Sequence, residues 1–456
     1  MTGFSTINPY TTELINHYEY MTPNELEQQV AGAATVYKVW ASEPLLTRMR
    51  FLERLAQLLR QHKPRLALLA TTEMGKPIAQ AESEVEKCAK ACDFYAASAP
   101  SMLADEVVAT EYHRSYVCHR PLGVVLAIMP WNFPYWQVIR CAVPATLAGN
   151  TVLLKHADNT TGCALALAEI WREAAERDGI LTTLITDHEA IKEVIADPRV
   201  RAVSLTGSER AGSAVAELAG RHLKKIVLEL GGSDPYLVLR DADVAMAVRT
   251  CVDSRFINNG QSCVAAKRFI VATEVYKEFV SNFVELTKAR RSGDPLDRNV
   301  QIGPMARADL RHALAKQVEL SVVQGAKVEV GGRFGEGCGF LYEPTVLTAV
   351  DANMPVFTDE VFGPVAPIIK AVDEAHAVAL ANQTRYGLGA AIFSRDVDHA
   401  ETLARNNLQA GFVAINSMVV SDPRLPFGGV GASGFGRELA DYGLGEFVNV
   451  KTMVVA

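Results

Sequence analysis

The segment GVVLAIMP (Gly123–Pro130) begins the part of the chain that decides the fold. It is a short apolar run, and four more such runs follow, separated by helix-like sequence. They are TVLLKHA (Thr151–Ala157), LTTLIT (Leu181–Thr186), AVSLTG (Ala202–Gly207) and KIVLELGG (Lys225–Gly232). Continuous apolar strands that alternate with helices are typical of a parallel sheet covered on both faces. The pattern predicts a doubly wound α/β domain.

The sequence on either side of this region predicts further elements. The first hundred residues read as helices, and Thr22-Pro23 is a cap and first-turn signal for a helix to about Trp40. Further helices are expected over 45–61, 63–74 and 79–97. After Gly232 a second α/β region follows. The chain ends in an apolar strand-like tail, which we expect beside the segment His113–Val125, with an edge suited to a second subunit.

Polar residues follow the apolar runs at the ends where a parallel sheet binds ligands. Asn132 lies in PWNFP, a rigid loop that suits an oxyanion donor, although a plain turn asparagine fits as well. Glu229 ends an apolar strand, where a carboxylate is costly unless it is paired or used. LTGSERAG carries Gly207 and Gly212 after a strand and at the start of a helix, which suits a pyrophosphate or a simple turn.

Composition excludes several classes of function. The 456 residues carry a net charge of −7, which argues against a nucleic-acid or anionic-membrane partner. No apolar run has the length of a transmembrane helix, and the start of the chain lacks a signal-peptide pattern, so we expect a cytoplasmic protein. The eight cysteines form no CxxC pair and the ten histidines no HExxH pattern, so we expect no disulfide scaffold and no metal site.

One cysteine has unusual neighbours. Cys263 lies in NNGQSCVAAKRF (Asn258–Phe269), whereas most free cysteines are small buried hydrophobes. A thiol, an oxyanion donor at Asn132, a base at Glu229 and a bound hydride acceptor together oxidise an aldehyde to an acid through a thioester. The thiol must ionise, so we expect local dipoles or a cationic cofactor ring to lower its pKa.

Six motifs in order make the chain resemble the aldehyde dehydrogenase superfamily along nearly its whole length. They are PWNFP, LTGS, LELGG, NNGQSC, EVFGP and PFGGVGASGFGRE. The resemblance implies that Cys263 is the nucleophile, that Glu229 activates water, and that Asn132 forms the oxyanion hole with the Cys263 N–H. A water-activating glutamate favours hydrolysis over acyl transfer to coenzyme A. The cofactor-binding residues that the resemblance implies are Trp131, Lys155, Asp158, Gly207, Ser208, Leu230, Glu360 and Phe362.

The cofactor choice depends on KHADNT (Lys155–Thr160), where the family often has a glutamate that bonds the ribose 2′-hydroxyl. Asp158 takes that place, and a carboxylate repels a 2′-phosphate. We therefore expect NAD rather than NADP. Asp is shorter than Glu, however, and Thr160 and Thr161 suit a phosphate, so NADP remains an alternative.

The substrate expectation depends on Arg140, which lies on an otherwise apolar helix. If it faces the substrate tunnel it clamps a distal carboxylate, and the alternative is a structural salt bridge. KHA, WQVIR, QSCVAAKRF and SDPRLPFGG resemble the bacterial succinate-semialdehyde dehydrogenase branch of the family. That resemblance implies a substrate pocket formed by Trp136, Arg140, Ser262 and Ser421. A broad-specificity or glutaric-semialdehyde enzyme, a non-catalytic structural protein on the same fold, and a cysteine hydrolase are the rival hypotheses.

The expected organisation follows the aldehyde dehydrogenase fold. Residues 1–112 and 126–232 form the dinucleotide-binding domain, and 233–432 form the catalytic domain. Residues 113–125 and 433–456 form an oligomerisation segment, so we expect a homodimer or a homotetramer.

Overall fold

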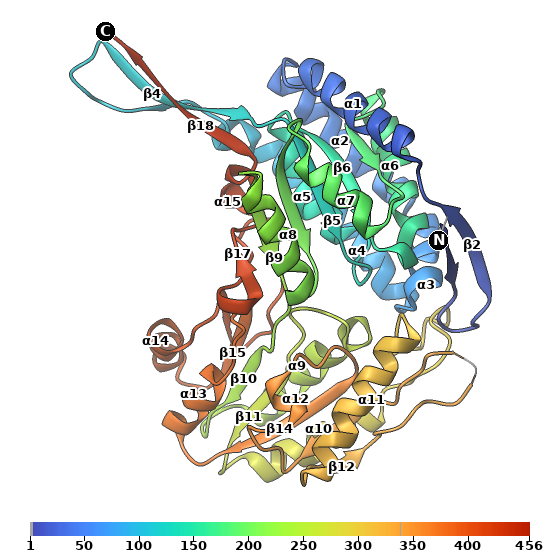
Figure 1. Cartoon of the computed structure of the whole chain (residues 1–456). Coiled ribbons are helices and arrows are strands. Elements are labelled where there is room, and N and C mark those ends of the chain that lie inside the picture. Colours follow the sequence, from blue (N-terminus) through green and yellow to red (C-terminus); the bar gives the residue numbers. More distant parts are fainter. Residues whose placement is uncertain (1–2, 338) are drawn as a thin grey trace.

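The computed structural model describes residues 3–337 and 339–456, so Cys338 lies outside the described residues. Figure 1 shows two α/β bodies, one above the other, and a narrow arm of strands that projects from the upper body. Within the described residues, no helix combines the length and apolar character that crossing a membrane requires.

The upper body is built on a six-stranded sheet in the order β17-β9-β8-β5-β6-β7. Its parallel strands are β5 (Val124–Met129), β6 (Thr151–His156), β7 (Leu181–Thr183), β8 (Val200–Thr206) and β9 (Lys225–Glu229). The short β17 (Gly434–Phe435) adds antiparallel to β9. The predicted doubly wound sheet is confirmed, and its strand order reverses between β5 and β8, where such sheets bind ligands.

Alternate side chains of these strands enter two different cores, as the two-residue period of a strand requires. Val125 and Leu154 pack with α4 (Ile78–Met102) and α5 (Trp136–Leu147). Val124, Leu126 and Leu153 pack on the other face with α1 (Pro23–Trp40) and α7 (His188–Ala196). The remaining helices of this body are α2 (Leu45–Gln61), α3 (Lys63–Met74), α6 (Thr161–Ala175) and α8 (Glu209–Arg221).

The predicted start of α1 is confirmed by a capping box. Thr22 Oγ1 accepts a hydrogen bond from the Glu25 N–H, and Glu25 Oε2 accepts one from the Thr22 N–H. The helical interpretation of the residues before Thr22 is wrong, because β1 (Gly3–Ile7) and β2 (Leu14–Glu19) form an antiparallel hairpin. Its strands are mostly exposed and carry little apolar alternation, the signal by which a strand is predicted.

The lower body is built on a seven-stranded sheet in the order β12-β13-β14-β11-β10-β15-β16. All neighbours are parallel except β12 and β13. The strands are β10 (Pro235–Val238), β11 (Arg268–Ala272), β12 (Lys327–Val330), β13 (Thr345–Thr348), β14 (Val365–Ala371), β15 (Gly389–Phe393) and β16 (Phe412–Ile415). The helices are α9 (Val244–Phe256), α10 (Tyr276–Lys288), α11 (Ala308–Val323), α12 (Pro355–Thr358), α13 (Glu374–Asn382) and α14 (Val397–Asn407).

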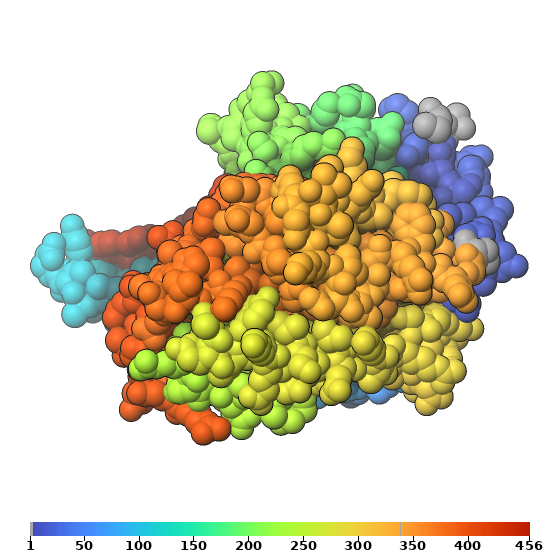
Figure 2. Space-filling view, turned by 90° about the horizontal axis from the view of Figure 1, so that it is seen from below, coloured from blue at the N-terminus to red at the C-terminus, as the bar shows by residue number. Residues whose placement is uncertain are grey.

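The projecting arm contains the tail strand β18 (Val448–Val455), which follows α15 (Ala440–Gly445). It pairs antiparallel with β4 (Arg114–Pro121), and β3 (Glu106–Val107) lies on the other side of β4. The arm extends beyond both bodies in Figures 1 and 2, and β18 is an edge strand of this small sheet. The tail thus lies beside the expected segment of its own chain and keeps one edge unpaired within the described chain.

Candidate functional site

The loop that carries Cys263 has an unusual backbone. It follows the 3₁₀ turn Ile257–Gly260, in which Asn258 and Asn259 are left-handed, with φ of 52° and 59°. Asparagine is among the few residues that adopt this conformation readily. Gly260 follows with φ of 72°, and a Cβ there would lie 2.3 Å from the Gly363 carbonyl oxygen. The run NNG therefore forms a tight turn that no bulky residue could make.

Side-chain hydrogen bonds fix this loop from several directions. Asn258 Nδ2 donates to the carbonyl oxygens of Asn132 (2.8 Å) and Gln261 (2.9 Å). Lys267 Nζ donates to the carbonyl oxygen of Cys263 itself, at 2.6 Å. Asn259 Nδ2 donates to the Gly75 carbonyl oxygen at 2.9 Å, which joins the loop to the turn after α3. These contacts hold Cys263 on a rigid support, as a positioned nucleophile requires.

Asn132 and Cys263 lie together at this loop. Asn132 follows β5, and its Nδ2 donates to the Gln261 carbonyl oxygen at 3.1 Å. An amide nitrogen carries two hydrogens, so one N–H remains for another acceptor. Among the described residues, the backbone N–H of Cys263 donates to no backbone or side-chain acceptor. Two donors thus remain available at the loop that carries the thiol, and an oxyanion hole is composed of such donors.

Glu229 lies at the end of β9 and is buried, with 1% of its surface exposed. Its Oε2 accepts a hydrogen bond from Arg140 Nη2 at 3.1 Å, and Oε1 has no partner among the described residues. Burial raises the pKa of Glu229, while Arg140 and the nearby Cys263 thiol oppose that rise. Glu229 is therefore a carboxylate beside the thiol with a raised pKa and one free oxygen, as a general base needs.

Arg140 has two carboxylate partners, which is the ion pairing that the structural alternative describes. Its second partner is Glu438, whose Oε2 lies 2.7 Å from Arg140 Nε. All three side chains are almost fully buried. Burial also raises the pKa of Glu438 to about 7. Ion pairing does not by itself exclude contact with a substrate, so the role of Arg140 as a substrate-binding residue stays a prediction.

The protein's own groups do not lower the pKa of Cys263, so the expected lowering by a cationic cofactor ring stays a prediction. Burial raises the pKa of the Cys263 thiol well above its usual value, and the neighbouring Glu229 adds to the rise. Arg140 and Lys267 act in the opposite direction, but these two cations do not outweigh the desolvation of the thiolate. The thiol is therefore mostly protonated at neutral pH in this state.

A cavity of about 290 Å³ opens beside Cys263. The four residues expected to bind the substrate, Trp136, Arg140, Ser262 and Ser421, all line it. Most of its remaining lining is apolar, including Phe133, Met418 and Val419. An apolar pocket with few polar groups is the usual form of a small-molecule site. The structure thus brings the predicted nucleophile and the predicted substrate residues to one cavity.

Lys87, a cationic side chain that lines the cavity, was not among the residues predicted from the sequence. Lys87 of α4 donates from Nζ to Ser421 Oγ at 2.8 Å, and its ammonium lies 4.3 Å from the centre of the Trp136 ring. Trp136 Nε1 also donates to Ser421 Oγ, at 3.0 Å. The helix EVEKCAK gives no sign in the sequence that its lysine faces a cavity instead of solvent, because charged residues recur on both sides of it.

The predicted cofactor residues of the upper body lie at the carboxyl ends of β6 and β8. Lys155 Nζ donates to Asp158 Oδ1 at 2.7 Å, so the Asp158 carboxylate is already paired with a cation. Ser208 is the N-cap of α8, where its Oγ accepts from the Ala211 N–H at 3.3 Å. A Cβ on Gly207 would make ordinary van der Waals contact with Leu205 at 3.6 Å, so a side chain here would meet no steric clash.

The other predicted cofactor residues lie on the segments that follow β5 and β9 and on the segment that precedes β14. Glu360 Oε1 accepts from the Gly232 N–H at 3.1 Å and lies 3.2 Å from Lys267 Nζ. Phe362 packs edge-on against Trp131, with ring centres 5.8 Å apart. Leu230 is buried against Gly212, where a Cβ would lie 2.6 Å from a Leu230 methyl group. Lys267, which no sequence argument singled out, joins Glu360 to the carbonyl of Cys263.

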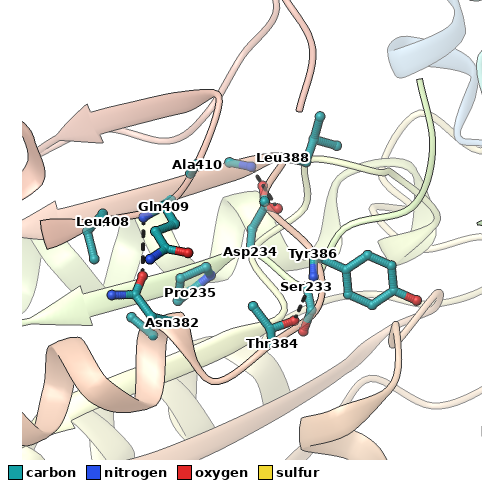
Figure 3. A pocket seen from close by; sticks show the side chains of 14 residues that line it. Ser233, Asp234, Pro235, Asn382, Thr384, Tyr386, Leu388, Leu408, Gln409 and Ala410 are labelled. Carbon is teal, nitrogen blue, oxygen red and sulfur yellow. Dashed lines mark hydrogen bonds between the residues drawn. The ribbon is translucent and has the colours of Figure 1, made fainter. Parts of the chain in front are cut away.

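A second hollow lies in the lower body and has a different character. Figure 3 shows its lining residues, among them Asp234, Tyr386 and Gln409, and its volume is only about 10 Å³. Asp234 Oδ1 accepts a hydrogen bond from the Gly389 N–H, and burial raises the Asp234 pKa to about 7. A space of this size holds about one water molecule and no aldehyde. The cavity beside Cys263 is the candidate site because it contains the predicted nucleophile and the four predicted substrate residues.

Comparisons with known proteins agree with this geometry. The model of the aldehyde dehydrogenase family matches residues 1–453. A succinate semialdehyde dehydrogenase of Escherichia coli (strain K12), named as using NAD(P)+, is 45% identical over 98% of this chain and 96% of its own length. A probable NADP+-dependent succinate-semialdehyde dehydrogenase of Synechocystis is 44% identical over the full length of both chains.

A solved structure gives the same result for the fold. The succinic semialdehyde dehydrogenase of Streptococcus pyogenes, in complex with NADP+, superimposes with a TM-score of 0.97. It is 37% identical in sequence, and 99% of each chain is covered. The α/β organisation predicted from the apolar runs is therefore shared by a solved relative of similar length.

Proposed function

The chain belongs to the aldehyde dehydrogenase family, and from this premise we propose that it oxidises succinic semialdehyde to succinate with a nicotinamide dinucleotide. One observation carries the choice of substrate: a single cavity contains the thiol of Cys263 and, on its wall, hydrogen-bond donors and a cation. An aldehyde with a distal carboxylate fits this cavity, because the thiol can react with the aldehyde while the donors and the cation bind the carboxylate. The relatives named as succinate-semialdehyde dehydrogenases support the same choice.

In the proposed reaction, Cys263 Sγ adds to the aldehyde carbon, and the resulting oxyanion accepts hydrogen bonds from Asn132 Nδ2 and the Cys263 N–H. The loop contacts from Asn258 and Lys267 support this role, because they fix the thiol and its own N–H. A bound nicotinamide dinucleotide supplies the hydride acceptor. The acyl group then remains on Cys263 as a thioester.

Glu229 completes the proposed cycle as a base. Its free Oε1 takes a proton from water, and the water attacks the thioester carbon and releases the acid. The same carboxylate, which faces the thiol, accepts the Cys263 proton before addition and releases it to solvent before it acts on water. The proton that it then takes from water passes to the departing Cys263 thiolate. In this proposal Arg140 is a positioning residue that holds Glu229 through Oε2 and leaves Oε1 to react.

The described residues fit the dinucleotide that the family implies. The N-terminus of the thirteen-residue helix α8, which follows Gly207, suits a pyrophosphate. Lys155 and Asp158 would hold the adenosine ribose, and Glu360 would hold the nicotinamide ribose. Gly231 fits this scheme as well, since a Cβ there would lie 2.4 Å from Glu360 Oε2 and displace that carboxylate.

The comparisons do not support the expected preference for NAD over NADP. Two relatives are named with NADP+ or NAD(P)+, and the Streptococcus pyogenes structure contains NADP+. The Lys155–Asp158 salt bridge offers a physical reason, because a paired carboxylate repels a 2′-phosphate less than a free one. We therefore propose that this protein accepts NADP at least as well as NAD.

A kinetic matrix of substrates and cofactors tests the proposed function. Succinic semialdehyde, glutaric semialdehyde and butanal are each assayed with NAD and with NADP. The proposal requires the highest kcat/KM with succinic semialdehyde and a stoichiometric yield of succinate without coenzyme A. A higher kcat/KM with butanal, or acid formation only when coenzyme A is present, contradicts it.

We propose a homo-oligomer in which the arm takes part. The edge strand β18 has an unpaired side, and its Val450 and Val454 are exposed. An unpaired strand edge with apolar side chains is a template for pairing with a second chain. A dimer and a tetramer are both compatible with this edge.

A further inference from the structure

We propose that Lys87 binds the distal carboxylate of the substrate, together with the hydroxyl group of Ser421. The proposal deepens the proposed function and rests on it, since it names the groups that select an acidic aldehyde. Lys87 and Ser421 lie on the wall of the cavity that contains Cys263. They come from α4 and from the loop after β16, which are far apart in the sequence.

The hydrogen bonds of Ser421 give the first argument for this carboxylate site. A serine hydroxyl has two acceptor positions and one donor. Ser421 Oγ accepts from Lys87 Nζ at 2.8 Å and from Trp136 Nε1 at 3.0 Å, so both acceptor positions are filled. Only the O–H remains, and it donates to no described residue. The Ser421 hydroxyl can therefore donate one hydrogen bond to a ligand, and a carboxylate oxygen is a strong acceptor.

The charges around the cavity give the second argument for this carboxylate site. Arg140 forms salt bridges with Glu229 and Glu438, so its positive charge has partners within the described residues. Lys87 forms no salt bridge within the described residues, and its ammonium bonds only Ser421 and stacks on Trp136. Three donors on an ammonium with one bond leave two for a ligand. Lys87 is thus the cavity's uncompensated cation among the described residues.

The pKa of Lys87 agrees with this placement. Burial, and after it the neighbouring Arg140, lower the Lys87 pKa to about 8. Glu84 and Cys88 of α4 and Asp422 of the loop face it and act in the opposite direction. A bound carboxylate favours the charged ammonium. Discrimination in favour of an acidic aldehyde should therefore be full below pH 8 and should fall as the pH rises above it.

The substitution Lys87→Met tests the proposal, with Lys87→Arg as the charge-conserving variant and Lys90→Met as the matched control. Lys90 lies on the same helix and is exposed. The readout is the ratio of kcat/KM for succinic semialdehyde to kcat/KM for butanal. Because a hydrogen bond to a charged partner is strong, Lys87→Met should lower this ratio at least about tenfold, through KM for the semialdehyde. Lys87→Arg and Lys90→Met should keep most of it.

The outcomes separate this proposal from the proposed function. If the wild type prefers the semialdehyde and Lys87→Met keeps that preference, the Lys87 proposal is overturned and the function stands. If the wild type has no such preference, the proposed function fails. Competitive inhibition by succinate then tests separately whether Lys87 binds a carboxylate. An increase of about tenfold or more in the inhibition constant in Lys87→Met supports carboxylate binding by Lys87, and an unchanged constant overturns it. A pH-independent ratio between pH 7 and 9 in the wild type also counts against the proposal.

Discussion

Arg140 Nη2 lies 3.1 Å from Glu229 Oε2, and both side chains are buried beside Cys263. This ion pair changes the interpretation of Arg140, which the sequence presents as a candidate clamp for the substrate. The arginine fixes one oxygen of the proposed base and leaves the other for water. Glu438 Oε2 lies 2.7 Å from Nε of the same guanidinium, so the three side chains form a buried triad of one cation and two carboxyl groups.

Replacing Arg140 with Met should impair the enzyme for every aldehyde. Removal of the cation leaves two buried carboxylates without it, which typically costs about 3–5 kcal/mol. We expect a lower unfolding temperature and a lower kcat with succinic semialdehyde and with butanal alike. The exposed Arg50→Met is the control. A stable variant that loses only its affinity for the semialdehyde would show that Arg140 is itself the clamp.

Glu438→Gln should change how stability depends on pH. Burial raises the folded pKa of Glu438 to about 7 from an ordinary value of 4.5, so the folded state binds more protons between these values. For a carboxyl with a raised pKa, stability is greatest below the unfolded pKa and falls as the pH rises toward the folded one. The unfolding temperature of Glu438→Gln should therefore improve relative to the wild type from pH 4.5 to 7. A constant difference between the two proteins over this range would count against the raised pKa.

Alkylation of Cys263 reports its ionisation. Since burial and Glu229 raise the thiol pKa, modification by iodoacetamide should be slow at pH 7 and should accelerate as the pH rises beyond 9. Glu229→Gln removes a nearby negative charge and should speed the reaction at pH 8. Peptide mass spectrometry measures the rate at Cys263 alone. A rate that is already maximal at pH 7 would mean that the thiol ionises readily without a cofactor.

Asp158 should control the choice between the two nucleotides. Asp158→Asn removes the carboxylate and frees Lys155 Nζ, which lies 2.7 Å away, for a 2′-phosphate. We expect the ratio of kcat/KM for NADP to that for NAD to rise about tenfold, from the removal of one close like charge. Asp178→Asn, on an exposed segment, is a control. An unchanged ratio would place the discrimination elsewhere.

The arm should control the oligomeric state. Val450→Asp with Val454→Asp places charges on the exposed tail strand and should lower the molecular mass measured by sedimentation. Val323→Asp, on an exposed position of α11, should not change it. If the double variant keeps the wild-type mass, β18 is not part of the subunit contact.

The sequence predicted the first sheet well because its information is local. Each strand is a continuous apolar run, and α1 begins at a cap with a glutamate three residues later. The hairpin of β1 and β2 was missed because exposed strands carry little periodic signal.

The candidate site likewise contains residues that the sequence predicts and residues whose roles only the structure shows. Cys263, Glu229 and Asn132 are visible in motifs. Lys267 and Glu438 also lie in quoted motifs, but their roles, like that of Lys87, depend on contacts between distant segments. Glu438, one of the two partners of Arg140, lies nearly three hundred residues away in the chain, so no local pattern could reveal this ion pair.

The most direct test of the central claim is to identify the acyl group on Cys263. Glu229→Gln, which lacks the proposed base, is mixed with succinic semialdehyde and NADP, quenched in acid and analysed by peptide mass spectrometry. The account predicts one equivalent of reduced nucleotide per active site and a succinyl group on the peptide that contains Cys263. A Cys263 peptide that stays unmodified while nucleotide is reduced, or a succinyl group on a different residue, would contradict it.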